Sequence, residues 1–568
     1  MRGEYVPARE SGSVEELIPP TDDSTKDFPT EVEEVVEATT GEELPARAST
    51  ARNTAIFGGL TGLSRIAGLA REILAAGYYG TSGAASAFTF AFLIPNTVRS
   101  LFADSALSGA FIPVFSDLLE KKRKAEAFRL ASTLFMVMFA ALGLLTVLFI
   151  LIAPWLVPLI TPTKIVDAGL TDLTVGLSQL LFPIVMILGL NGLVVGILQA
   201  YDRFTIPALS ALVWNIVIMG SMVTLQPFFD GVNSIYAYAI GIVIGTVVQF
   251  LMALPVLRKV GFHFSFAFDW KDRRVLEVFT LMLPVTLGLG LINLNLMANA
   301  IIGGEISDQV PRAIDAGFRI YMLPQGIFSV AISTVLFPQL ARMASRPDFE
   351  GVQRLCAQGL RFIFLMLLPA TAAIAALAHP MTELIFQRGE FTAESTDFVA
   401  TGLFVFAFSL PFSGINLLLT RTFFSLKRPW TVTYLAIGNL IVNVVASILL
   451  LPLGIGGVVL GTVIADVAMA AGQFYFLRRV LGGTLQLEDM WVPVVKMLVG
   501  TVVFAGVAYG VWFGLEALLG GSLIAQIVEV GVALIAGAIV YIGIVVGLKV
   551  DEATNLTRMF RERLGGSS

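Results

Sequence analysis

The sequence predicts an all-α, polytopic membrane protein with about fourteen transmembrane helices. It predicts two pseudo-symmetric six-helix bundles followed by two C-terminal helices. Three observations support this fold class: the composition, a succession of long apolar runs and an internal repeat. Hydrophobic residues make up 56% of the 568 residues and charged residues only 14%, with a mean hydropathy of +0.82. Because an average soluble domain is about 25% charged, this composition excludes an ordinary soluble protein.

The composition also limits the chemistry of the chain. Cys356 is the single cysteine, and His263 and His379 are the two histidines. This excludes intramolecular disulfides and cysteine-ligated zinc or iron–sulfur sites, and it leaves little room for histidine-based catalysis. We therefore expect a transporter rather than an enzyme, with no metal site, no cofactor and no nucleic-acid partner.

Apolar runs long enough to cross a bilayer follow one another along most of the chain, and about 20 such residues suffice for one span. The predicted helices lie near 53–78, 84–118, 127–155, 170–200, 205–227, 233–257, 273–303, 311–342, 352–377, 394–425, 430–451, 455–479, 491–516 and 522–548.

The distribution of basic residues predicts the topology. With the N-terminus in the cytoplasm, the cytoplasmic loops and the C-terminus hold twenty-two Lys and Arg, whereas the outer loops hold Lys164, Arg312 and Arg388. Basic residues accumulate on the cytoplasmic side of membrane proteins. We therefore expect a multi-pass protein of the cytoplasmic membrane with both termini in the cytoplasm.

The N-terminal segment, residues 1–51, has a different composition. Its first fifty residues contain thirteen acidic and four basic side chains, and Pro, Ser, Thr and Glu dominate. Such a segment cannot bury a core, so it predicts a disordered acidic cytoplasmic tail. It lacks the apolar region of a signal peptide. A regulatory docking segment is the alternative interpretation.

An internal repeat organises the predicted helices. Three pairs of residues recur at separations of 225 to 229, which predicts two halves of the same topology, related by an axis along the membrane normal. Parallel repeats of this kind place a substrate site between the halves near the membrane midplane. Chance spacing of prolines is the alternative. The matched pairs are Pro95 and Pro324, Pro113 and Pro338, and Arg203 and Arg428.

The repeat defines the expected domains. They are the tail (1–51), the first six-helix bundle (52–258), the second bundle (259–480), two extra transmembrane helices (481–548) and a cytoplasmic C-terminal tail (549–568). The repeated prolines also remove backbone donors, so we expect broken helices that line a cavity. Ordinary kinks are the alternative.

Four arginines interrupt the predicted helices: Arg65, Arg71, Arg99 and Arg319. An arginine at membrane depth costs about 2.5–3.5 kcal/mol and normally faces a bundle interior or a wet cavity. Converging guanidinium groups pair bidentately with phosphate or pyrophosphate and stay charged when desolvated. The arginines therefore predict an anionic substrate, and the apolar helices beside them favour one with a lipid tail.

Structural alternatives exist for the arginines. Arg71 could pair with the adjacent Glu72, and Arg99 with Asp104. Arg319 is harder to explain in this way, because no acidic residue follows Asp315 closely in its own helix.

Several motifs resemble the MurJ/MviN family of lipid II flippases, over roughly residues 53–548. The motifs are Ser64-Arg65-x-x-Gly68-x-x-Arg71, then Ala87-Phe88-x-x-Ala91-Phe92-x-x-Pro95-Asn96-x-x-Arg99-x-x-Phe102-Ala103-Asp104-x-Ala106, Arg203-Phe204-x-Ile206-Pro207, Phe386-Gln387-x-Gly389-x-Phe391-Thr392 and the 319–338 stretch.

This resemblance implies a fold of the multidrug/oligosaccharidyl-lipid/polysaccharide exporter type, with a groove for the lipid tail beside the last two helices. It implies that Arg65, Arg71, Arg99 and Arg319 grip the pyrophosphate of lipid II, the undecaprenyl-pyrophosphate-linked precursor of peptidoglycan. Membrane lipids are further expected partners, and the tail would contact cell-wall synthesis or division proteins. The supporting cavity and hinge residues are Ser64, Gly68, Pro95, Asn96 and Asp104.

The chain also departs from the family pattern. Acidic residues that many members carry fall on Ser86 and Met322 here. Residues associated with sodium in some members fall on neutral amides, with Asp466 nearby as a substitute or as a hydrogen-bonded structural residue. The resulting candidate ion site comprises Asn299, Asn439, Asn443 and Asp466.

We therefore expect a flippase that moves lipid II to the outer leaflet by alternating access, in peptidoglycan biosynthesis, cell-wall biogenesis and the maintenance of cell shape. Membrane potential or a monovalent cation would reset the cycle, since the sequence contains no ATP-binding P-loop. An exporter of another lipid-linked oligosaccharide or of an amphiphilic drug is the main alternative. A membrane glycosyltransferase is a weaker one, since the loop acids Asp269, Asp272, Glu383 and Glu390 lack metal-ligand spacing. A further alternative is a non-transporting scaffold whose arginines only pair with acidic residues.

Overall fold

The computed structural model describes residues 58–102, 105–265, 272–346, 349–482, 490–555 and 557. In these residues the secondary structure is helical, with no strand. Within the described residues, each of the fourteen predicted helical ranges coincides with mainly helical structure, because long apolar runs in a low-polarity environment must satisfy their backbone groups internally. A short helix, α5 (Thr163–Asp167), was not predicted.

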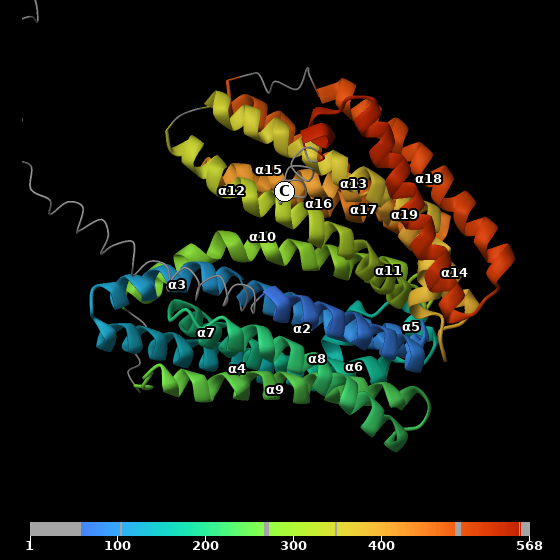
Figure 1. Cartoon of the computed structure of the whole chain (residues 1–568). Helices are drawn as coiled ribbons and strands as arrows, with labels where there is room; N and C mark the ends of the chain where they lie inside the picture. The colour runs from blue at the N-terminus through green and yellow to red at the C-terminus, as the bar shows by residue number, and fades with distance from the viewer. Residues whose placement is uncertain are drawn as a thin grey trace, which may run out of the picture. The chain divides into compact units, whose positions relative to one another are not determined.

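The first helix covers residues 58–79 in the described part of the chain. The helices that follow it (Figure 1) are α2 (Gly83–Phe102), α3 (Ser105–Glu120), α4 (Lys124–Ile160), α5, α6 (Thr171–Leu181), α7 (Ile184–Ala200), α8 (Thr205–Leu225), η1 (Gln226–Phe228), η2 (Gly231–Ile235), α9 (Tyr236–Lys259), α10 (Arg273–Gly303), α11 (Val310–Pro324), η3 (Gln325–Ser329), α12 (Val330–Ser345), α13 (Phe349–Phe386), α14 (Ala393–Ala407), α15 (Leu410–Ser425), α16 (Pro429–Leu449), η4 (Leu451–Leu453), α17 (Gly454–Val480), α18 (Trp491–Leu519) and α19 (Leu523–Gly547).

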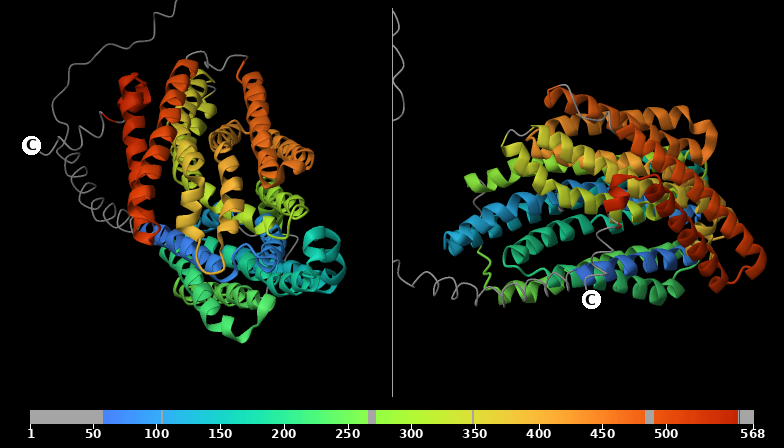
Figure 2. Two further views of the ribbon diagram at one scale, coloured as in Figure 1. Left: turned by 90° about the vertical axis from the view of Figure 1, so that its right-hand side faces the viewer. Right: turned by 45° about the horizontal axis from the view of Figure 1, so that its top comes forward.

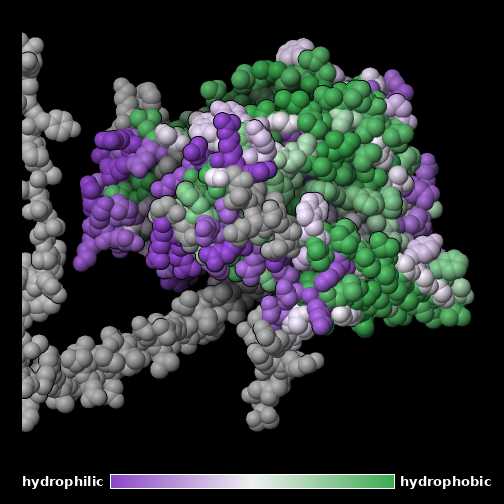
Figure 3. Space-filling model, turned by 90° about the horizontal axis from the view of Figure 1, so that it is seen from above, coloured by the Kyte–Doolittle hydropathy of each residue, from purple (hydrophilic) through white to green (hydrophobic). Residues whose placement is uncertain are grey.

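The helices make a multi-pass membrane protein. By length and composition, ten helices of the described residues can cross a membrane, and eleven can if the bent pair α14 and α15 forms one span. Their outward faces are apolar; Trp155 and Leu159 on α4, for example, are 74% and 82% exposed. Figure 3 shows a broad band of hydrophobic residues on one face, with hydrophilic residues toward its ends. The count of fourteen spans stays a prediction.

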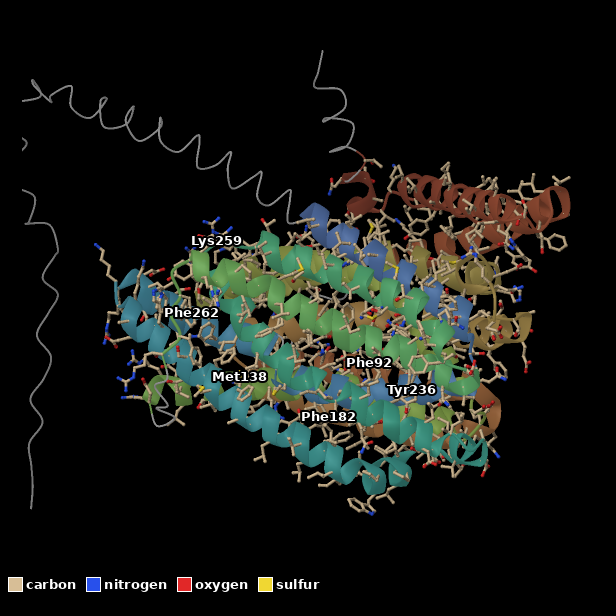
Figure 4. All side chains as sticks on the ribbon, turned by 90° about the horizontal axis from the view of Figure 1, so that it is seen from below. Phe92, Met138, Phe182, Tyr236, Lys259 and Phe262 are labelled. Atoms are coloured by element: carbon tan, nitrogen blue, oxygen red, sulfur yellow. The ribbon has the colours of Figure 1, made fainter. Side chains whose placement is uncertain are left out.

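Helices α10 and α11 lie between two groups of helices (Figures 1 and 2). Helices α2 to α9 pack on one side, and α12 to α19 on the other; α10 contacts both α2 and α16. Two of the buried cores follow this division. One, which includes Phe182 and Met138, draws on α2, α3, α4, α7, α9 and α10, and the other, which includes Leu360 and Phe423, draws on α12, α13, α15, α16 and α17. Figure 4 labels Phe182 and Met138, together with the two ends of α9 at Tyr236 and Lys259.

The breaks in the helices differ in part from the prediction. Pro95, Pro113 and Pro338 each lie inside a continuous helix, so the prediction of breaks at these prolines was wrong. A proline removes one backbone hydrogen bond, and packing against neighbouring helices holds the chain helical on both sides. Pro324 does coincide with a change, because the π-helical turn η3 begins directly after it. The chain also bends by 50° between α14 and α15.

Candidate functional site

Helix 58–79 places a buried ion pair in the interior of the protein. Arg71 and Glu72 are only 8% and 3% exposed, and Nη2 of Arg71 lies 2.6 Å from Oε1 of Glu72. The guanidinium of Arg71 also lies over the ring of Trp214 on α8, 4.8 Å from its centroid. The alternative that Arg71 pairs with Glu72 is therefore confirmed.

Glu72 also binds two arginines of α11. Its Oε2 lies 3.2 Å from Nε of Arg319 and 3.4 Å from Nη2 of Arg312. Tyr238 of α9 donates a hydrogen bond from its hydroxyl to Oε1 of Glu72 at 3.2 Å. One carboxylate of the first helix thus joins groups from three different helices.

Asp315 completes this cluster from the α11 side. Its Oδ2 lies 2.7 Å from Nη1 of Arg312 and 3.0 Å from Nε of Arg319. The spacing of three and four residues puts all three side chains on one face of α11. We call Arg71, Glu72, Arg312, Asp315 and Arg319 the arginine network. With three arginines and two carboxylates, it carries one excess positive charge when all are ionised.

Two predictions about these residues were wrong. Arg319 does have acidic partners, because Asp315 lies one turn before it and Glu72 reaches it from another helix. Arg312, which was assigned to an outer loop, is 4% exposed within α11 and belongs to the network. The 312–315–319 spacing is a sequence signal for this face, whereas the contribution of Glu72 depends on tertiary packing.

The other two predicted arginines lie in different surroundings. Arg65 is exposed, and its Nη1 lies 3.4 Å from the position that a Cβ on Gly326 would occupy, so it faces the π-helical turn η3. Within the described residues Arg65 forms no ion pair. Arg99 donates hydrogen bonds from Nε and Nη2 to Oδ1 of Asn96, at 3.2 and 2.9 Å. Asp104 lies outside the described residues, so its predicted pairing with Arg99 is untested.

The residues predicted to support the cavity have packing contacts. Asn215 of α8 approaches the carbonyl of Ser64 at 3.5 Å, and its Oδ1 lies 3.7 Å from where a Cβ on Gly68 would be. Asn96 donates a hydrogen bond to Oδ1 of Asn293 on α10 at 2.9 Å, which links α2 to α10. Pro95 is buried inside α2. Because Ser64 and Gly68 are small, helix 58–79 can approach α8 closely.

Beyond the network, the end of helix 58–79 contacts the loop after α13. The backbone N–H of Glu390 donates to the carbonyl of Gly77 at 2.9 Å. Gly80 and Gly389 both have positive φ, and a Cβ on either would collide with a backbone carbonyl of the opposite segment. Only glycine fits both the conformation and the space at these positions. We call this contact the glycine closure.

The four residues of the candidate ion site lie in one buried polar cluster. The side-chain amides of Asn299 and Asn443 both donate to Oγ1 of Thr462, at 2.9 and 3.2 Å. Asn439 donates to Oδ1 of Asp466 at 3.4 Å, and Ser409 donates to Oδ2 of the same carboxylate. Asp466 is the one carboxylate among these groups, and the described residues contain no group of three or more His, Cys, Asp or Glu that could hold a metal ion.

Comparisons with known proteins identify relatives over most of the chain. The family model described as "Lipid II flippase MurJ" matches residues 75–528. The chain is 30% identical to the "Probable lipid II flippase MurJ" of Rhizobium tropici, over 82% of this chain and 87% of that protein. It is 29% identical to the "Lipid II flippase MurJ" of Burkholderia cenocepacia, over 81% of this chain and 90% of that protein.

Solved structures support the fold. A structure described as "Lipid II flippase MurJ, inward closed conformation" is similar with a TM-score of 0.72 and 20% identity, over 88% of this chain and 99% of that chain. An inward-facing multidrug resistance transporter of the MATE family is similar with a TM-score of 0.62 and 15% identity, over 77% and 99% of the two chains. At these identities the structural likeness concerns the fold alone.

Proposed function

Because the chain belongs to the MurJ family of lipid II flippases, we propose that it moves lipid II from the inner to the outer leaflet of the cytoplasmic membrane. The observation that carries this proposal is the buried arginine network between helix 58–79 and α11. Arginine is the side chain best suited to a desolvated pyrophosphate, because its planar fork of donors matches phosphate oxygens and its charge persists on burial.

The network supports an alternating-access cycle. In this conformation Glu72 and Asp315 form ion pairs with the guanidinium groups of Arg71, Arg312 and Arg319. Separating helix 58–79 from α11 removes Glu72 from Arg312 and Arg319, and uncompensated buried charges are costly. A pyrophosphate that enters between the helices replaces the lost carboxylate, so substrate binding and opening favour each other.

Arg65 is the first contact that we propose for the substrate. Its guanidinium is exposed and has no acidic partner among the described residues, so it binds phosphate without losing an ion pair. Arg71 and Arg319 then take over as Glu72 withdraws. Arg99, oriented by Asn96, is the proposed fourth contact.

The wider architecture follows from the same proposal. We take the fourteen helical ranges as fourteen spans, with the helices of residues 52–258 and of residues 259–480 as two bundles and both termini in the cytoplasm. Helices α18 and α19 pack against each other and expose apolar residues such as Val502 and Ile539, which suits a groove for the lipid tail. The glycine closure then lies at the extracytoplasmic end.

We further propose that a monovalent cation or the membrane potential resets the cycle through the Asn299–Asp466 cluster. One elementary charge moved across 100 mV supplies about 2.3 kcal/mol. Asp466, held by Asn439 and Ser409, is the one carboxylate available there to carry a cation or a proton. For the acidic tail we propose an interaction with cell-wall synthesis or division proteins.

Complementation of a flippase-depleted bacterium tests the function. We expect the native chain to restore growth and Arg319→Ala to fail at equal membrane expression, while Arg346→Ala, which changes an exposed arginine after α12, restores growth. Rescue by all three chains would contradict the role of Arg319. Failure of the native chain despite good expression would favour the alternative substrates, another lipid-linked oligosaccharide or an amphiphilic drug.

A further inference from the structure

A second polar site lies away from the arginine network, where α13 ends, α18 ends and α19 begins. Figures 1 and 2 show α18 and α19 side by side, and α13 packs against both. A small cavity of about 290 Å³, part of it open to solvent, lies between these three helix ends. Its lining residues are Pro380, Glu383, Trp512, Glu516, Gln526 and Glu529, with Gly521 and Val530.

Three carboxylates from three different helices face this cavity. Glu383 comes from α13, Glu516 from α18 and Glu529 from α19, and all three line the cavity. In the described part of the chain, no lysine or arginine forms an ion pair with any of them. The site therefore carries a concentrated, uncompensated negative charge.

Glu529 is the residue that indicates a ligand. It is only 3% exposed, and its Oε1 is buried without a hydrogen-bond partner in the structure. A buried carboxylate oxygen without a partner is expensive, and two further carboxylates beside it raise that cost. Gln526 donates its amide to Glu383 at 2.9 Å and so does not satisfy Glu529. A positively charged group in the cavity would satisfy it.

The neighbouring basic side chains do not fill this role. Nδ1 of His379 lies 3.9 Å from Oε2 of Glu383, and its other ring nitrogen contacts Asp397 at 3.2 Å. Arg388 directs its guanidinium to the carbonyls of Leu384 and Ile385. Neither forms a hydrogen bond or ion pair with Glu529 in the described residues.

The lining favours an organic ammonium group over a bare metal ion. The described residues contain no set of three or more His, Cys, Asp or Glu placed to hold a metal ion. Trp512 supplies an aromatic ring, which attracts alkylammonium groups through its face.

We propose that this cavity binds an alkylammonium group, with Glu529 as its principal contact and Glu383, Glu516 and Trp512 around it. The ammonium can belong to a lipid head group or to a free amine. The exposed apolar faces of α18 and α19, which include Leu518 and Ile524 near the cavity, give lipids direct access to it. This site is separate from the arginine network, and its binding can be measured without any transport.

The test uses the full-length purified protein in a maltoside detergent and ethanolamine hydrochloride as the probe. We expect ethanolamine to raise the midpoint of thermal unfolding in a saturable way relative to sodium chloride at the same ionic strength. Glu529→Gln should require at least tenfold more ethanolamine for the same rise. Glu350→Gln, an exposed glutamate on α13, should behave as the native chain.

A second variant distinguishes a loss of binding from a loss of folding. Glu516 is exposed, so Glu516→Gln should fold normally and require several-fold more ethanolamine. An equal response of the native chain to sodium and ethanolamine would overturn the proposal, as would native-like curves for both variants. Nanodiscs of phosphatidylethanolamine and of phosphatidylglycerol distinguish a lipid head group from a free amine as the ligand. Stabilisation by phosphatidylethanolamine without added amine identifies a lipid head group. An equal requirement for ethanolamine in the two kinds of nanodisc identifies a free amine.

Discussion

The Glu72 carboxylate on helix 58–79 lies 3.2 Å from Nε of Arg319 on α11. This contact joins the first helix of the chain to a helix of its second half, and it is 4% exposed on the Glu72 side and 31% exposed on the Arg319 side. A substrate anion that reaches Arg319 therefore competes directly with a carboxylate that holds the two helices together.

Removing the charge of Glu72 should destabilise the protein. Glu72→Gln leaves Arg71, Arg312 and Arg319 with the single carboxylate of Asp315. Breaking a buried ion pair typically costs about 3–5 kcal/mol, so we expect a clearly lower midpoint of thermal unfolding in detergent, followed by circular dichroism. Glu350→Gln is the matched control and should unfold as the native chain does. A native midpoint for Glu72→Gln would show that the network does not hold these helices together.

The geometry of Arg319 should matter for transport beyond its charge. Arg319→Lys keeps a positive charge beside Glu72 and Asp315 but loses the planar fork that binds phosphate bidentately. One lost charge-assisted hydrogen bond is worth about 1.5–3 kcal/mol, so we expect lipid II translocation in reconstituted vesicles to fall at least tenfold while the unfolding midpoint stays near the native value. The control variant Arg346→Lys should translocate lipid II as the native chain does. Full activity of Arg319→Lys would indicate that only its charge is used.

The glycine closure should be sensitive to a single methyl group. Gly389 has φ +59°, and a Cβ there would collide with the carbonyl of Gly77. We expect Gly389→Ala to open this end of the protein. A cysteine introduced at Thr81 should then react with a water-soluble maleimide several-fold faster than the same cysteine does in a chain that keeps Gly389. Gly169→Ala is the control, because Gly169 also has positive φ (+72°) but has open space around its Cβ position. Equal labelling in both variants would rule out the closure as a gate.

Asp466 should affect the driving force rather than the fold. Asp466→Asn keeps the hydrogen-bonding shape next to Ser409 and Asn439 but removes the charge. We expect translocation by this variant to lose its dependence on membrane potential or on sodium, with an unfolding midpoint at or above the native one. Asp230→Asn, which changes an exposed loop residue, should retain the native dependence. An unchanged response of Asp466→Asn would remove this cluster from the coupling mechanism.

A contact at the start of α10 gives a prediction for pH. Burial raises the pKa of Asp272, but hydrogen bonds from the backbone and guanidinium of Arg274 outweigh it and hold the pKa below its ordinary value. A lowered carboxyl pKa contributes stability above the unfolded value of about 3.9, which is lost as the pH falls through the folded pKa. Asp272→Asn should therefore lower the unfolding midpoint by the same amount at pH 6 and pH 8. If the difference in unfolding midpoint between the native chain and Asp272→Asn vanished already at pH 6, the lowered pKa of Asp272 would be contradicted.

Local sequence determined the helices of this protein. Apolar runs such as 273–303 and 522–548 predict their helices almost to the residue, because hydropathy is a property of consecutive residues and a buried backbone must bond within its own segment. Likewise, the adjacency of Arg71 and Glu72 indicated an ion pair as the alternative interpretation of Arg71, and the structure confirms this pair. The breaks were predicted less well, since a proline's effect depends on which helices pack around it.

Only the tertiary structure decided which charges meet. Nothing in the sequence around Glu72 indicates that it binds Arg312 and Arg319, and nothing around Glu529 indicates that Glu383 and Glu516 face the same cavity. Ion pairs and cavities depend on the rotation and register of helices that are far apart in the chain, and helical periodicity does not specify either. The sequence by itself therefore established a polytopic helical membrane protein with arginines inside it, whereas packing determined their partners.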